Sequence, residues 1–406
     1  MICYYFPPLG GTGSLRALKF ATYLPKFGWE PVVVAPRRGA SYQDPSLSIG
    51  QTSVYRTGNL QLGRMTKGIL GERASRAALK TSVAGRVRNL LRRWLYRPDG
   101  QVGWYPFAVN AGRRAAHEYR FDAIFSTSFP ITSHLVARRL HRDTGIPWVA
   151  EFRDLWTQWG SASPRRQRLD QAMERSILTE AAEVVTVSSA FADGLRLQGA
   201  QRVSVVTNGF DPDDFPEPAM YEGVVVTYLG TYYPGHQDLG TALRALGSLA
   251  GEGMLPGLRV RFVGELESRL AQTIADSGIK DLVQCTGFVS HKEALRYICE
   301  SALLLHAGPV SVDTEKVRGI IPGKTFEYLG SRRPILFIGN PTSDVAQLLR
   351  PFANVRIVAP GDVDGAKTSV LALLRQSEPP SSSSLQCFTS SYVTAQLAKT
   401  LDRVGV

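Results

Sequence analysis

The chain has 406 residues, a net charge of +12, and 44% hydrophobic and 20% charged residues. This length predicts about two or three domains, and the composition is typical of a soluble globular enzyme. No run approaches the ~18 apolar residues of a membrane span, and the opening residues lack the basic start of a signal peptide, so neither is expected.

Short apolar runs alternate with longer helical patterns along the whole chain. This alternation is typical of parallel sheets covered by helices on both faces, and each half has enough strands for one doubly wound domain. The expected strands lie at 2–6, 32–35, 123–126, 148–151, 184–187 and 203–207 in the first half, and at 224–229, 260–263, 282–286, 302–306, 335–338 and 355–358 in the second.

A glycine-rich loop at 7–14 follows the first expected strand and opens a helix. Glycines allow a phosphate to approach the backbone closely. The loop is not Gly-x-Gly-x-x-Gly, and the next strand is followed by Arg37-Arg38 instead of an acidic residue, which disfavours a dinucleotide dehydrogenase. A tight turn without a ligand is the alternative.

Ten basic residues and one acid lie between Arg64 and Arg97. Within this basic segment (62–97), leucines and a tryptophan at 90–95 form an apolar stripe at helical spacing. A basic amphipathic helix suits an anionic membrane surface or acceptor, but a solvated helix packed on its own domain fits equally well. No nucleic-acid partner is expected, because no RNP, helix-turn-helix or zinc motif accompanies the charge.

Polar residues follow two of the expected strands. Arg153 and Asp154 come after the strand at 148–151, and Gly230 and Thr231 come after the strand at 224–229. The carboxyl ends of buried parallel strands open into the ligand cleft, so these residues are candidates for binding a phosphate or substrate hydroxyls. A mutual ion pair is the alternative for Arg153 and Asp154.

The Pro- and Asp-rich segment 208–218 has neither a helical nor a strand period and is the expected domain boundary. We therefore expect an N-terminal domain at 1–210, a C-terminal domain at 219–385, and a last helix within 386–406 that returns to the N-terminal domain. Two doubly wound domains in tandem form a cleft between their strand ends, where a ligand is expected.

Three local motifs are interpreted as structural. Ser290 and Glu293 have the spacing of a capping box, so His291 between them is taken as structural as well. Asp-x-Asp occurs at 211–213 and at 362–364, both in loops, where turn chemistry explains it. No metal site is predicted.

The most informative motif is segment 321–338, which predicts a Pro/Gly turn, a short helix and a buried strand. A helix that starts at Gly323 presents unpaired N–H groups and a partial positive charge, which suits a diphosphate, and Lys324 adds a full charge. Glu327 shares a face with Lys324 and can accept hydrogen bonds from a vicinal diol. Diphosphate and ribose are neighbours in a nucleotide, but a solvated ion pair on an ordinary helix is the alternative.

Taken in order, these segments resemble the bacterial group 1 glycosyltransferases, which form family 4 of the GT-B fold. The resemblance covers nearly the whole chain, and it implies an α/β fold of two doubly wound, Rossmann-like domains that face each other across a cleft. The motifs that carry it lie at 4–11, 98–108, 125–130, 134–135, 145–156, 185–188, 208–211 and 322–329.

The resemblance implies a retaining, metal-independent glycosyltransferase of the hexosyl- or N-acetylhexosaminyl class. It would use a nucleotide sugar, with UDP as the expected nucleotide, and no cofactor. The acceptor would be a polysaccharide, lipid-linked or other glycan, and the location cytoplasmic. The basic charge of segment 62–97, and not the resemblance, adds the expectation of peripheral contact at the inner membrane face. Alternatives are a natural-product glycosyltransferase, an inactive GT-B partner subunit and a sugar-nucleotide epimerase.

The resemblance also assigns roles to residues. Glu327 matches the glutamate that holds the ribose hydroxyls, and Arg153 stands where many relatives carry an active-site histidine. The implied catalytic residues are Arg153, Asp154 and Lys324; the implied donor contacts are Gly10, Gly11, Gly13, Gly230, Thr231, Gly264, Phe288, Val289, Lys324 and Glu327; the implied acceptor contacts are Trp104 and His134.

Two departures from the family pattern stand out. Gly319 occupies the place where many relatives carry the first glutamate of a Glu-x7-Glu pair. Tyr232, Tyr233 and His236 lie in the loop where many relatives carry arginine and lysine. These departures leave the donor contacts and the identity of the sugar open.

Overall fold

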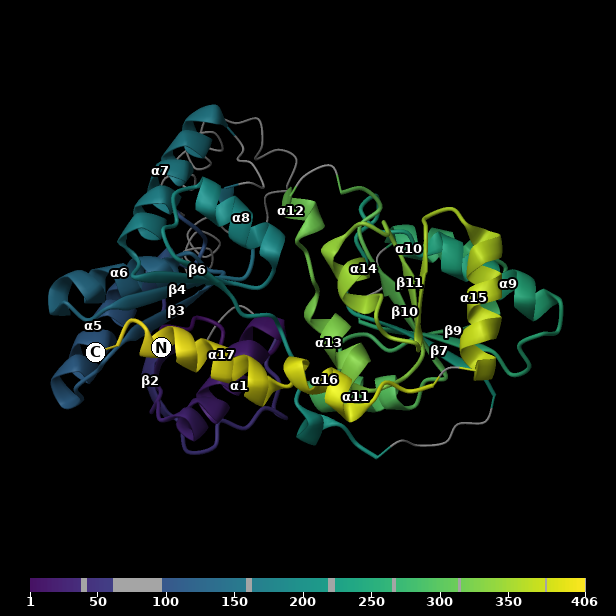
Figure 1. Cartoon of the computed structure of the whole chain (residues 1–406), viewed down its shortest axis with the longest axis horizontal. Helices are drawn as coiled ribbons and strands as arrows, with labels where there is room; N and C mark the ends of the chain where they lie inside the picture. The colour runs from purple at the N-terminus through teal and green to yellow at the C-terminus, as the bar shows by residue number, and fades with distance from the viewer. Residues whose placement is uncertain are drawn as a thin grey trace, which may run out of the picture.

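Two α/β domains lie side by side in the computed structural model of the chain (Figure 1). The structure describes residues 1–37, 42–60, 97–157, 163–217, 223–264, 268–312, 315–376 and 378–405. Residues 61–96 hold nearly all of the basic segment and its expected apolar stripe, and they lie outside the described residues.

A parallel sheet forms the centre of the N-terminal domain, and Ile2 joins its two halves by bridging to Val34 and Ser126. The strands in spatial order are β2 (Ser53–Thr57), β1 (Val32–Pro36), β3 (Ile124–Ser128), β4 (Trp148–Phe152), β5 (Glu183–Thr186) and β6 (Val203–Val205). The helices are α1 (Thr12–Tyr23), α5 (Tyr105–Glu118), α6 (Thr132–Thr144), α7 (Pro164–Glu180) and α8 (Ser189–Leu197).

Both faces of this sheet are buried. Trp148 and Phe152 of β4 pack in the cluster formed with α5 to α8, whereas Val149 packs on the opposite face with α1 and the C-terminal helix. Because side chains alternate between the faces of a strand, a strand buried on both sides has no polar period. This explains why the apolar runs of the sequence predicted the strands.

Two expected strands of this sheet need correction, and one observed strand has no expected counterpart. Pairing of the expected strand 2–6 is confined to the region around Ile2, because the chain turns at Pro7 and Pro8, which have no N–H to donate. β2 was not expected, since its sequence is polar and its exposed end lies at the edge of the sheet. The expected strand 203–207 ends at Val205, because Arg16 binds the next two carbonyl oxygens.

The C-terminal domain contains a six-stranded parallel sheet in the order β12-β11-β10-β7-β8-β9. Helices cover both of its faces, as expected for a doubly wound domain. The strands are β7 (Val225–Leu229), β8 (Arg259–Val263), β9 (Val283–Cys285), β10 (Leu303–Ala307), β11 (Ile335–Ile338) and β12 (Val355–Val358). α9 (Gly240–Gly251), α10 (Ser268–Ala275) and α15 (Val363–Gln376) cover one face, and α11 (His291–Cys299), α13 (Gly323–Gly330) and α14 (Asp344–Leu349) cover the other.

The chain crosses between the domains twice at one place. After α16 (Ser382–Leu385), α17 (Ser390–Asp402) leaves the C-terminal domain and packs beside α1 (Figure 1). The two crossings are hydrogen-bonded, because Phe210 N–H donates to the Phe388 carbonyl (2.9 Å) and Ser390 N–H donates to the Phe210 carbonyl (2.6 Å). Among the described residues, no helix is long and apolar enough to cross a membrane.

Candidate functional site

The N-termini of α1 and α13 meet between the two domains. Gly11 precedes α1 and Pro322 precedes α13, and no side chain caps either helix. Thr12 lies so close to Gly323 that a Cβ atom on Gly323 would be 2.6 Å from Thr12 Cγ2. Both helix ends carry a partial positive charge and N–H groups without helical partners, so the space beside them suits an anion.

Arg153 adds a full positive charge on the N-terminal side. Its Nε donates to the Ser128 carbonyl (2.6 Å) and its Nη2 donates to the Phe129 carbonyl (3.2 Å). The guanidinium covers Gly13, where a Cβ atom would lie 2.6 Å from Nη1. Arg153 and the glycine loop therefore lie together, and Asp154 follows with an exposed side chain.

Lys324 adds the matching charge on the C-terminal side. Its Nζ donates to the Leu229 carbonyl at the end of β7 (2.8 Å) and lies 3.9 Å from the centroid of the Tyr228 ring, beside Gly230. Burial lowers the pKa of Lys324 to about 7, and the charge of Glu327 opposes this shift. An anion bound beside Lys324 would favour its charged form.

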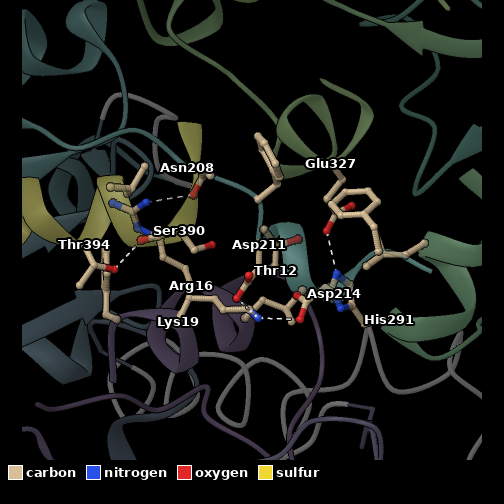
Figure 2. Close-up of a pocket in the computed structure, with 18 residues that line it drawn as sticks. Thr12, Arg16, Lys19, Asn208, Asp211, Asp214, His291, Glu327, Ser390 and Thr394 are labelled. Atoms are coloured by element: carbon tan, nitrogen blue, oxygen red, sulfur yellow. Dashed lines mark hydrogen bonds and ion pairs between the residues drawn. The ribbon is translucent and has the colours of Figure 1, made fainter. Parts of the chain in front are cut away.

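Glu327 points away from Lys324 and toward α11. Its Oε1 lies 3.0 Å from His291 Nε2, and the two side chains are 18% and 16% exposed (Figure 2). Burial lowers the pKa of His291, but the hydrogen bond and charge of Glu327 outweigh it, so that the pKa is raised overall. The expected cap of α11 is present, since Ser290 Oγ accepts the Glu293 N–H (3.3 Å), but His291 also contacts an expected donor residue.

Glu327 and His291 line a pocket between α1, α11, α13 and the crossing segments (Figure 2). The pocket holds about 610 Å³, including space open to solvent. Thr12, Arg16 and Lys19 of α1 contribute to its wall. Arg16 and Lys19 were not expected from the sequence, although their spacing from Thr12 places all three on one helical face.

These two charges of α1 hold the first crossing segment. Arg16 donates to Asn208 Oδ1 of this segment (3.3 Å) and forms a buried ion pair with Glu151 of β4 (2.8 Å). Lys19 forms ion pairs with Asp211 (2.7 Å) and Asp214 (2.8 Å). Asp211 also accepts the N–H of Asp213 (3.2 Å), so the first Asp-x-Asp forms a turn.

The other expected donor residues lie in loops at the carboxyl ends of strands of the C-terminal sheet. Gly230 and Gly264 have φ angles of +96° and +133°, and Gly264 N–H donates to the Gly287 carbonyl (3.0 Å), so three strand-end loops meet there. Thr231 is exposed and Val289 is half-buried. Phe288 is 64% exposed and stacks on Tyr42 of the N-terminal domain, while Gly10 N–H donates to the Tyr42 carbonyl (2.8 Å).

Trp104 and His134 do not face this site, so their expected acceptor contacts are wrong for this structure. Both side chains are fully buried. Trp104 Nε1 donates to Thr57 Oγ1 (2.7 Å), and His134 Nδ1 pairs with Ser126 Oγ (2.8 Å). Burial, followed by the charge of Arg153, lowers the pKa of His134 to about 3, so its ring is neutral.

Gly319 is buried against the N-terminal domain. A Cβ atom there would lie 2.5 Å from Phe191 Cδ1 and 2.9 Å from Ser188 Oγ, at the start of α8. The position where many relatives carry a glutamate thus has no room for a side chain. The second departure from the family pattern lies in the loop after β7. There Tyr232 OH donates to the Gln237 carbonyl (3.0 Å), whereas Tyr233 and His236 are exposed.

Replacing Gly319 by glutamate is expected to lower the free energy of unfolding by about 1–3 kcal/mol, because the side chain must displace a buried ring. Urea denaturation measures this change. Gly251 at the end of α9 has no atom within 4 Å of an added Cβ, so Gly251→Glu is the matched control and should cost about 0.5 kcal/mol or less. Equal stability of the two variants would contradict the packing at Gly319.

Within the described residues, no three His, Cys, Asp or Glu side chains converge to hold a metal ion. The cationic groups of the site are side chains and helix ends from both domains. The site can therefore bind an anion through Arg153, Lys324 and backbone N–H groups, and offers a carboxylate, Glu327, nearby.

Solved structures with low sequence identity share this architecture. Residues 11–209 match the family model described as "Glycosyl transferase 4-like domain", and no curated protein sequence matches the chain.

HepE from Anabaena, solved in complex with UDP, is 14% identical with a TM-score of 0.60, and the match covers 99% of this chain and 98% of that chain. Sucrose-phosphate synthase from Thermosynechococcus elongatus is 13% identical with a TM-score of 0.58, and the match covers 100% of this chain and 94% of that chain. The lipopolysaccharide outer core galactosyltransferase WaaB is 13% identical with a TM-score of 0.54, and the match covers 99% of this chain and 98% of that chain.

Proposed function

We propose that this chain is a group 1 glycosyltransferase of the GT-B fold and that it transfers a sugar from a nucleoside diphosphate sugar to an acceptor hydroxyl. The family accounts for the class of reaction, glycosyl transfer. The observation that supports this site is the meeting of two uncapped helix N-termini, one from each domain, with Arg153 and Lys324 beside them.

In this proposal the diphosphate lies beside the starts of α1 and α13. Lys324 approaches it from the C-terminal domain and Arg153 from the N-terminal domain, while Glu327 accepts hydrogen bonds from the ribose diol. Gly10, Gly11, Gly13, Gly230, Thr231, Gly264, Phe288 and Val289 complete the donor contacts. UDP is the proposed nucleotide, supported by HepE, which was solved with UDP.

The proposed chemistry is departure of the nucleoside diphosphate with retention of the anomeric configuration. The leaving group gains negative charge, and fixed cations and N–H groups stabilise that charge without reorganising. In this proposal that stabilisation comes from Lys324, Arg153 and the two helix N-termini, without a metal ion or cofactor. The acceptor then attacks on the face that the diphosphate leaves, so that no protein nucleophile is required, and Asp154 lies at the same strand end for contact with the acceptor.

The proposed acceptor is a polysaccharide, lipid-linked or other glycan at the cytoplasmic face of a membrane. This choice rests on the excess of positive charge in segment 62–97, which favours an anionic surface. The transferred sugar is proposed to be a hexose or an N-acetylhexosamine.

Thermal unfolding with a panel of nucleotide sugars tests the donor. A bound donor is expected to raise Tm, because it binds only the folded chain. At a donor concentration of a hundred times Kd, the free energy of unfolding should rise by about 2.7 kcal/mol. Glu327→Ala should weaken binding and transfer by about ten- to a hundredfold, since hydrogen bonds to a charged group are lost. Glu293→Ala, an exposed carboxylate on α11, is the control. Unchanged donor hydrolysis and transfer in Glu327→Ala would refute the site.

A second candidate is an inactive partner subunit, favoured by Gly319 in place of the family glutamate. The two candidates differ in one measurement. Release of sugar from a nucleotide donor by the isolated chain supports the enzyme, whereas binding without any release or transfer supports the inactive subunit.

A further inference from the structure

A loop of the N-terminal domain contacts the N-terminus of α11 in the C-terminal domain. Asp44 is only 3% exposed, and its Oδ2 accepts the backbone N–H of His291 (2.8 Å). Its other oxygen, Oδ1, accepts the N–H (3.0 Å) and the hydroxyl (2.6 Å) of Ser46. A carboxylate at the start of a helix is favoured by the helix dipole, and here that carboxylate comes from the other domain.

An aromatic contact from the same loop joins the domains beside this hydrogen bond. The ring of Tyr42 stacks on Phe288, with centroids 6.0 Å apart and planes inclined by 20°. Tyr42 and Asp44 thus contact both the loop before α11 and its first turn. These contacts exist only while the two domains are in contact.

His291 connects the Asp44 contact to Glu327. Its backbone binds Asp44, whereas its ring binds Oε1 of Glu327 (3.0 Å). The charges of Asp44, Asp214 and Lys19 also act on the ring. A carboxylate has two oxygens. With Oε1 held by His291, the plane of the Glu327 carboxylate is restricted, and Oε2 is the oxygen available to a diol.

We propose that Asp44 and His291 are positioning residues for the nucleotide: contact between the domains through Asp44 orients His291, and His291 orients Glu327 toward the ribose diol. The proposal rests on the function proposed above. It makes ribose recognition depend on residues of both domains, although Glu327 belongs to only one. Neither residue needs to touch the nucleotide.

The affinities of the full chain for UDP and for 2′,3′-dideoxy-UDP measure ribose recognition, because only UDP has the diol. His291→Ala should lower the ratio of the two affinities by about two- to tenfold, the contribution of one hydrogen bond, with little change for dideoxy-UDP. His291→Gln keeps a donor to Glu327 and should retain most of the ratio. Equal weakening of both ligands in His291→Ala would indicate general damage to the fold and overturn the proposal.

Asp44→Ala should lower the same ratio, whereas Asp44→Asn, which keeps an acceptor for the His291 N–H, should retain it. Ser46→Ala removes a contact of Asp44 within its own loop and is the matched control, with an unchanged ratio. In the double variant of Asp44→Ala and His291→Ala, the ratio should be no lower than in His291→Ala alone, because Asp44 acts through His291. A further drop would refute this relay.

The outcomes separate this proposal from the one on which it rests. A wild-type chain that fails to bind UDP refutes the proposed donor and, with it, the positioning role. A wild-type chain that prefers UDP over dideoxy-UDP, with variants at Asp44 and His291 that keep the preference, refutes the positioning role alone.

Discussion

Replacement of Lys324 by alanine is expected to lower kcat/KM for glycosyl transfer by about 10²–10³-fold, the effect of removing one fixed group that stabilises developing negative charge. Lys324 Nζ is held between the Leu229 carbonyl and the Tyr228 ring, so its position does not have to be created when the donor binds. Steady-state kinetics with the donor found by thermal unfolding measures the change.

Lys292 on α11 provides the control for this variant. It is exposed and lies on another helix, so Lys292→Ala should leave kcat/KM unchanged. A loss in Lys324→Ala no larger than in the control would show that Lys324 does not act on the diphosphate.

The affinity for UDP should also depend on pH through Lys324. In the unliganded protein its pKa is about 7, against 10.5 for a free side chain, so above pH 7 most of the amine is neutral. The unfolded chain binds the additional proton between these values, so the unliganded protein gains stability as pH rises through this window.

A bound diphosphate favours the ammonium and raises its pKa, so binding above pH 7 takes up a proton. The affinity should therefore fall as pH rises above 7, by at most about tenfold per unit for one proton. Isothermal titration calorimetry at several pH values, in buffers of different ionisation enthalpy, measures both effects. In Lys324→Ala the dependence should disappear, and its persistence would assign the proton to another group.

Arg153→Ala is expected to be the second most damaging change, with kcat lowered by about 10²-fold. Two carbonyl groups, of Ser128 and Phe129, would lose their donor, which costs about 1–3 kcal/mol of stability. Such a cost leaves a typical domain folded, so the loss of kcat reports the missing charge and not unfolding. Chemical denaturation and kinetics on the same sample separate the two effects.

Arg113 offers a comparison for this variant. It pairs with Asp143 (2.6 Å) on the surface, where ion pairs contribute little, so Arg113→Ala should change neither stability nor kcat appreciably. Full activity of Arg153→Ala would mean that the guanidinium only supports the 128–129 loop.

The fold could be predicted from the sequence because its signal is local. Strands buried on both faces are runs of apolar residues, and the expected strands at 335–338 and 355–358 have the observed bounds. The errors occur where tertiary contacts decide whether a strand forms and where it ends. β2 is a polar edge strand, and β6 ends early because a side chain of α1 takes the carbonyl groups that follow it.

The candidate site could be predicted less completely than the fold. The glycine loop, Arg153 and the Lys324 helix are motifs at strand ends, so their place at the cleft followed from topology. The family resemblance assigns Trp104 and His134 to the acceptor, yet whether an aromatic side chain is buried depends on packing that no local pattern encodes. The capping pattern accounts for His291 only as a structural residue, because its ring contact with Glu327 joins residues 36 positions apart.

The sequence by itself determined two doubly wound domains and a cationic start of α13, because strand periods and helix ends are properties of neighbouring residues. Only the tertiary structure decided which side chains meet. Lys324 and Glu327 share a helix face, but one turns to β7 and the other to His291. Gly319 has no space for a side chain because α8 of the other domain occupies it. Contacts of this kind depend on how the two domains pack together.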